Sequence, residues 1–195
     1  MYKLCKTEQS ATRQRQLEQG LLELMHGKRY DEITISDLCD RLEIPRKSFY
    51  RYFVGKEGAL QALIDHTLME FEDYTVAYLR GKSRTIWLDL ESFFQFWVEK
   101  KELLDALSRS GLSGMLVNRA VAFAMTDDVL PVRFLPNDSR DMQQHVTMFG
   151  VCGLMSMVLN WHDNGYEEPA SEMARIAVRM ISRPLFPSVE EFVKN

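Results

Sequence analysis

The chain has 195 residues, 46% hydrophobic and 27% charged, enough apolar material to build a packed core. No run of 18 apolar residues occurs, and the first residues lack the apolar segment of a secretory signal, so we expect a cytoplasmic protein without a membrane partner. The three cysteines, Cys5, Cys39 and Cys152, are far apart without Cys-x-x-Cys spacing, which argues against a disulfide framework and a zinc site.

The net charge of −4 is unevenly distributed. Residues 1–56 carry 11 basic and 8 acidic side chains, a net charge of +3, whereas the remainder carries 13 and 20, a net charge of −7. A basic front joined to an acidic rear indicates two tasks in one chain, with any polyanionic partner bound by the front.

Two amphipathic helices are predicted first. One spans about 10–26, and Gly27 is placed to end it in a left-handed conformation; its apolar stripe consists of Leu17, Leu21, Leu24 and Met25. The second spans about 34–42, with Thr34 as N-cap and Asp37 three residues later in a weak form of the capping box.

A short third helix follows a proline. Pro45 ends the second helix but suits the first turn of a new one, predicted over 46–52 and followed by a long helix over about 56–79. Two helices joined by so short a turn describe a helix-turn-helix. The third helix carries cations and hydroxyls on one face, so we expect it to face outward above a small core of Leu21, Leu38, Cys39, Ile44, Phe49 and Phe53.

The rear of the chain is also helical. A break at 81–84 precedes helices predicted at about 85–100, 101–110, 112–125, 140–164 and 170–183. Strand signals are nearly absent, so the predicted fold class is all-α.

Several segments together carry a family signature. The front contains Gly-x-x-Tyr-x-x-Ile-Thr-Ile-x-Asp-Leu over 27–38, then Ser-Phe-Tyr-Arg-Tyr-Phe over 48–53 and Lys-Glu at 56–57. The back contains Asn-Trp-His-Asp-Asn-Gly over 160–165, leading to Pro169. These segments resemble the tetracycline-repressor (TetR) family of one-component transcription regulators. Relatives commonly have glycine at the position of Glu43, so a left-handed backbone there would cost roughly 1 kcal/mol.

The resemblance implies a helix-turn-helix DNA-binding domain over 1–55, a linking helix over about 56–80, and a helical ligand-binding and dimerisation domain over 81–195. It implies a homodimeric, ligand-responsive regulator, acting as a repressor on a palindromic double-stranded DNA operator. No cofactor is expected, and no catalytic constellation or Gly-rich phosphate loop supports an enzyme.

The resemblance also places the third helix in the major groove. We expect Arg46, Lys47 and Ser48 to reach base edges, because the N-terminal residues of a recognition helix reach deepest. Further contacts are expected from Tyr50, to a base methyl or a phosphate, and from Tyr52, Lys56 and Thr34, to phosphates.

Two rear surfaces are predicted. The last two long helices would form the dimer interface through Phe149, Gly153, Met157, Trp161, Ile176 and Met180, the alternative being that both helices are internal core. A pocket for a small apolar effector would include Trp97, Phe123 and Met148, although aromatic and Met side chains at helical spacing also suit plain core.

Two rival functions stay open at this point. One is a helical adaptor that keeps the fold and binds a protein partner in place of DNA. The other is a small all-α enzyme using the rear pocket, which requires titratable groups converging on a cavity.

Overall fold

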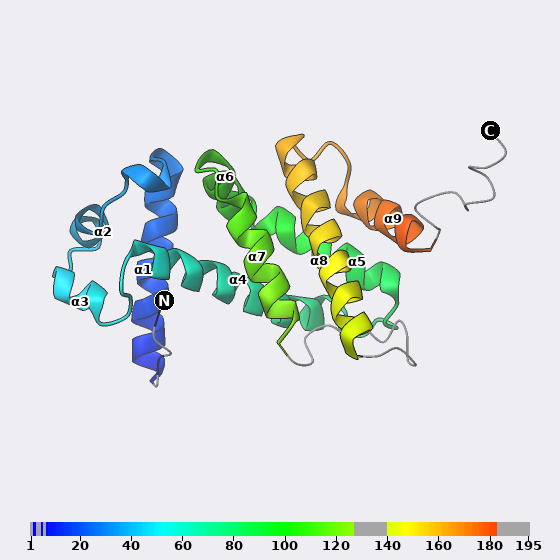
Figure 1. Ribbon diagram of the computed structural model, residues 1–195, viewed down its shortest axis with the longest axis horizontal. Helices are drawn as coiled ribbons and strands as arrows, with labels where there is room; N and C mark the ends of the chain where they lie inside the picture. Colours follow the sequence, from blue (N-terminus) through cyan, green and yellow to red (C-terminus); the bar gives the residue numbers. More distant parts are fainter. Residues whose placement is uncertain (1, 3–4, 6, 127–139, 183–195) are drawn as a thin grey trace.

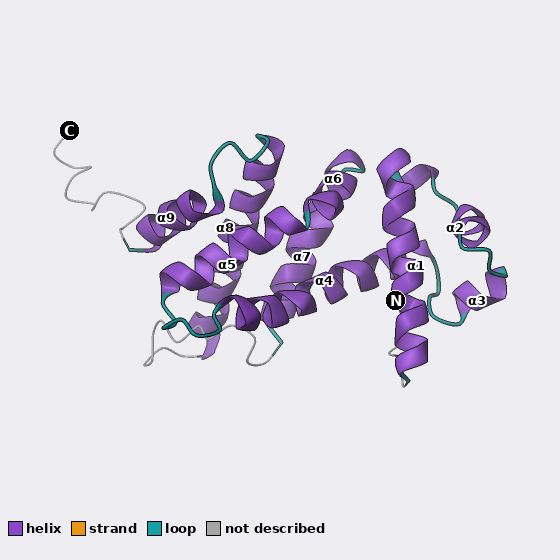
Figure 2. Cartoon of the chain, turned by 180° about the vertical axis from the view of Figure 1, so that it is seen from behind, coloured by secondary structure: helices purple, strands orange, loops and turns teal. Residues whose placement is uncertain are grey.

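The computed structural model describes residues 2, 5, 7–126 and 140–182, and within these ranges it is helical with no β-strand (Figures 1 and 2). An isolated bridge pairs Tyr2 with Phe53. The all-α prediction is confirmed. The helices are α1 (Glu8–Gly27), a 3₁₀ turn η1 (Tyr30–Glu32), α2 (Ile35–Arg41), α3 (Arg46–Tyr50), α4 (Lys56–Tyr78), α5 (Ile86–Glu99), α6 (Lys101–Arg109), α7 (Ser113–Ala124), α8 (Arg140–Asp163) and α9 (Ala170–Ile181).

The starts of the front helices follow from local capping. The Thr7 hydroxyl accepts a hydrogen bond from the Ser10 N–H at 3.2 Å and begins α1. At α2 the Thr34 hydroxyl accepts from the Asp37 N–H at 3.1 Å, and the Asp37 carboxylate accepts from the Thr34 N–H at 2.7 Å. The predicted capping box is therefore present.

The end of α1 differs from the prediction. Gly27 lies within the helix, and the chain leaves through Lys28 in an extended conformation with φ −133°. The last carbonyls of α1 accept hydrogen bonds from a residue far away in the sequence. Arg109 of α6 donates to Met25 O at 3.1 Å and to His26 O. A left-handed glycine is unnecessary where a guanidinium caps these carbonyls.

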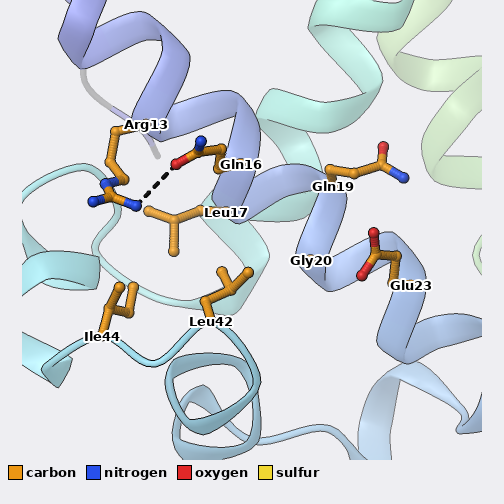
Figure 3. A pocket seen from close by; sticks show the side chains of 8 residues that line it. All are labelled: Arg13, Gln16, Leu17, Gln19, Gly20, Glu23, Leu42 and Ile44. Carbon is orange, nitrogen blue, oxygen red and sulfur yellow. Dashed lines mark hydrogen bonds between the residues drawn. The ribbon is translucent and has the colours of Figure 1, made fainter.

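The turn of the helix-turn-helix packs closely on α1. A Cβ atom on Gly20 would lie 3.0 Å from a methyl group of Leu42, so glycine permits the close approach. In Figure 3 the side chains of Leu42 and Ile44 point toward Leu17, in a cavity of about 290 Å³. Glu43, between them, has φ 51°, so this non-glycine residue adopts the left-handed backbone that would favour glycine.

The long helix α4 connects the two ends of the molecule (Figure 1). It packs against α1 at the front and against α5 and α7 at the rear, where α5 also packs on α9 and α7 on α8. The rear core is aromatic, and Phe94, Phe96 and Trp97 of α5 are fully buried in it. Observed helix boundaries in the described segments agree with the predicted ones to within a few residues.

Candidate nucleic-acid interface

Helix α3 is held by its aromatic side and exposes its basic side. Phe49 and Phe53 are buried, with ring centroids 5.3 Å apart, and anchor the short helix on the front core. Arg46 and Lys47 are exposed, and Tyr50 is 44% exposed. A five-residue helix is too short to be stable alone, so these aromatic contacts determine where it lies.

The front cations fall into two groups. In the first group, four basic side chains away from α3 each have an acidic neighbour; the pairs are Arg15 with Glu18 and Glu70, Lys28 with Asp37, Arg29 with Asp31, and Arg41 with Glu23. Within residues 7–56, five cations make no ion pair. Lys56 donates to backbone carbonyls instead, and the other four are Arg13, Arg46, Lys47 and Arg51. Three of these belong to α3 or its C-cap, and their positive charge is uncompensated by the protein.

Thr34 is exposed, but its side chain is engaged in the start of α2. Its hydroxyl donates to the Asp37 carboxylate at 2.8 Å while accepting from the Asp37 N–H. Hydrogen bonds from the Thr34 N–H and hydroxyl lower the pKa of Asp37, and the charge of Lys28 lowers it further. A phosphate contact by this hydroxyl would require it to leave the carboxylate.

Lys56 occupies a different position from the predicted one. Its Nζ donates to Tyr30 O at 2.6 Å, Ile33 O at 2.7 Å and Asp31 O at 3.3 Å, and it lies 4.4 Å from the centroid of the Tyr30 ring. An ammonium group has three donors, so all are used inside the protein. Lys56 thereby ties the η1 segment to the start of α4, and the predicted phosphate contact would require the ammonium to leave at least one of these carbonyls.

Ser48 and Tyr52 line a cavity of about 520 Å³ between α3 and the first half of α1. Tyr52 is only 7% exposed, and its hydroxyl has no hydrogen-bond partner among the described residues. Tyr52 forms part of the cavity wall, so a ligand can reach its side chain only through this cavity.

The residues predicted for a dimer interface divide into two sets. Phe149 is 70% exposed, Gly153 and Met180 are also exposed, and Met157 and Ile176 are partly buried. Trp161 does not lie on this surface. It is buried against Phe94 and Tyr166 and donates to Glu168 O at 3.0 Å.

The reason for the division of α8 is helical geometry. Steps of four residues advance about 400° each, so the sequence Phe149, Gly153, Met157, Trp161 turns by about 40° per step. Three steps carry Trp161 about 120° away from Phe149, onto the inner face. An outward stripe requires steps of three mixed with steps of four, and such a stripe is formed by the exposed residues Met142, His145, Phe149, Gly153, Ser156 and Asn160.

The three residues predicted for an effector pocket are not all brought together. Trp97 is 1% exposed and Phe123 is partly buried, whereas Met148 is exposed on the outer side of α8. The Met148 prediction is corrected accordingly. The Trp97 Nε1 is buried and has no hydrogen-bond partner, which is costly for a donor inside a protein.

Sequence reasoning missed Arg13. It lies on α1, lines the same cavity as Tyr52, and hydrogen-bonds only to the neutral Gln16 side chain, at 2.9 Å. The available signal was the absence of an acidic residue three or four positions away, because Gln9, Ser10, Gln16 and Leu17 occupy those places.

Comparison with known proteins places the fold. No protein-family model matches the sequence, and neither does any curated protein. A solved TetR transcriptional regulator from Streptococcus agalactiae is 14% identical with a TM-score of 0.64, covering 90% of this chain and 96% of that one. A structure from Syntrophomonas wolfei, described as a TetR-family regulator, is also 14% identical with a TM-score of 0.65, covering 91% and 98%.

The TetR-family repressor AlkX from a Dietzia strain gives 15% identity, a TM-score of 0.56, and coverage of 86% and 92%. At such low identity these similarities establish the fold, which is that of the TetR-family regulators named above. The fold expected from the sequence motifs is thereby confirmed. Separately, no helix within residues 7–126 and 140–182 combines the length and the apolar character needed to cross a membrane.

Proposed function

We propose that the chain is a DNA-binding transcriptional regulator that acts as a homodimer on a palindromic operator and responds to a small effector. The observation that carries the proposal is α3, which is anchored by Phe49 and Phe53 and displays Arg46 and Lys47 without any acidic partner. A helix of this size fits the major groove, and free cations suit its phosphate walls. In this proposal 1–55 form the DNA-binding domain, 56–80 the linking helix, and 81–195 the effector and dimer domain.

The proposed dimer forms through α8 and α9. Their outer sides expose Met142, Phe149, Met180 and Ile181, an apolar surface that a second copy would cover. Gly150 and Gly153 are exposed with open space where a Cβ would lie, so helices can approach closely there. A twofold arrangement would present two α3 helices, separated by about one turn of DNA, or 34 Å, or a multiple of it.

The proposed effector site is at the buried side of α5. Trp97 offers an indole N–H without a partner in an aromatic environment, which suits an apolar molecule that carries one hydrogen-bond acceptor. Two solved structures of this fold belong to a fatty acid degradation regulator from Bacillus halodurans and to AlkX, implicated in n-alkane biodegradation. Repression with release by the effector is the proposed outcome.

Selection of bound fragments from random DNA tests the proposal directly. The expected result is a palindromic consensus, bound with an affinity that falls steeply between 50 and 200 mM salt. Lys47→Ala should weaken binding or relax the preferred base, whereas Arg80→Ala, at an exposed site beyond α4, should leave binding unchanged. Absence of any enriched sequence would reject the proposal and favour the adaptor.

A further inference from the structure

The polar cavity between α1 and α3 has a composition that the rest of the front surface lacks. Its volume is about 520 Å³, and two guanidinium groups line it, Arg13 from α1 and Arg51 from the C-cap of α3. None of its lining residues is acidic. Lys28, Arg29 and Arg41 elsewhere on the front are paired with carboxylates, whereas the two guanidiniums of this cavity, like Arg46 and Lys47 on α3, are not.

The two walls of the cavity are regular helix faces. On α1, Gln9, Arg13 and Gln16 follow one another at spacings of four and three, so they share a face. On the opposite wall, Ser48 of α3 and the two residues that follow its end, Arg51 and Tyr52, line the same cavity. Side-chain amides, hydroxyls and guanidiniums are all groups that bind phosphate oxygens.

Tyr52 adds an uncharged hydrogen-bonding group to the wall of the cavity. Its side chain is more than nine-tenths buried and lines the cavity, yet its hydroxyl makes no hydrogen bond within the described residues. This hydroxyl is not among the fully buried polar atoms without a partner, so it is open to the cavity and can donate a hydrogen bond to an acceptor that enters there.

We infer that this cavity binds a phosphate group of the DNA backbone. The phosphate belongs to a strand that borders the groove that α3 enters. The inference rests on the proposed function and extends the DNA contact from α3 to α1. Ser48 belongs to both surfaces, since it follows Lys47 directly and also lines the cavity, so a strand at the groove wall passes the cavity. Contacts of this kind fix the register of the protein on the duplex and carry no base preference.

Paired measurements of affinity and salt dependence test this inference on the full-length protein and its selected operator. We expect Arg13→Gln combined with Arg51→Gln to weaken binding about tenfold or more and to reduce the slope of log K against log salt by about two. Arg80→Gln is the matched control, removing the same charge from an exposed site outside the cavity. Repeated selection with the double variant should return the wild-type consensus.

Tyr52→Phe provides a second readout, independent of charge. The hydroxyl has no partner in the free protein, so we expect an unchanged urea midpoint together with several-fold weaker DNA binding. Ethylation interference should show phosphates flanking the half-site that matter for the wild type and no longer matter for the double variant.

The outcomes separate the two proposals. If the wild type selects an operator but the double variant keeps the same affinity and salt slope, the cavity does not bind phosphate, while the proposed function stands. If the double variant changes the consensus, Arg13 or Arg51 reads bases and the backbone assignment is wrong. If the wild type selects no DNA, both proposals are rejected.

Discussion

Asp65 of α4 and Arg119 of α7 form a two-pronged ion pair across the boundary between the front and rear of the molecule. Arg119 Nε lies 2.6 Å from Asp65 Oδ1, and a second guanidinium nitrogen binds Oδ2. The Tyr2 hydroxyl donates to the same Oδ2 at 2.8 Å. Asp65 is buried, so this charge-assisted contact ties α7 to α4 at a position where its carboxylate is largely shielded from water.

Replacing this carboxylate should destabilise the fold. We expect Asp65→Asn to lower the free energy of unfolding by about 1–2 kcal/mol, less than for a fully buried pair because the Arg119 side chain is partly exposed. Urea unfolding measures the change. Asp89→Asn, which removes a surface partner of Arg84, should cost no more than about 0.5 kcal/mol. Equal effects of the two substitutions would show that the Asp65 pair has no special role.

Lys56 allows a test that separates a structural cation from a DNA contact. Because its ammonium donates to three carbonyls, Lys56→Met should lower the free energy of unfolding by about 2 kcal/mol. Lys47→Met, at an exposed unpaired site, should leave the free energy of unfolding within about 0.5 kcal/mol of wild type. Thermal and urea unfolding of both variants provide the comparison, and a stable Lys56→Met protein would restore the predicted phosphate role.

Features that depend on nearby residues could be predicted from the sequence. Capping at Thr34 and the stripe of Leu17 and Leu21 depend on neighbours within a few positions, and both were predicted correctly. At Glu43 the resemblance indicated only that relatives commonly have glycine, and the structure shows a left-handed backbone there. Local rules and motifs therefore account for the helices and for the presentation of α3.

Contacts between distant segments account for the errors. The end of α1 was predicted from Gly27 alone, but Arg109, more than 80 positions away, caps its carbonyls. The Lys56 ammonium was assigned by family position, and its carbonyl partners belong to a turn more than 20 residues earlier. Arg13 and Arg51 line one cavity only in the folded chain, so no spacing along the sequence reveals that they share it.

Two residues with positive φ should respond to glycine in opposite directions. At Glu43, with φ 51° and an exposed side chain, Glu43→Gly should raise the free energy of unfolding by about 0.5–1 kcal/mol through relief of backbone strain. At Tyr166, with φ 58°, the ring lies 4.8 Å from that of Trp161, so Tyr166→Gly should cost about 2 kcal/mol or more despite the same relief. Urea unfolding of both variants checks the signs, and destabilisation by Glu43→Gly would mean that its side chain makes a contribution larger than the strain.

The capping box at α2 should make stability depend on pH. Hydrogen bonds from Thr34, with the positive charges of Lys28 and Lys56, lower the pKa of Asp37 below its ordinary value of 3.8. A carboxyl with a lowered pKa in the folded state stabilises the protein above its ordinary pKa, and that contribution disappears as the pH falls through the lower folded-state value. The free-energy difference between wild type and Asp37→Asn should therefore favour wild type at pH 6 and shrink as the pH falls below 3.8. Unfolding curves at intervals from pH 6 to pH 2.5 measure it, and a difference that grows on acidification would show that the carboxylate is not stabilised by this cap.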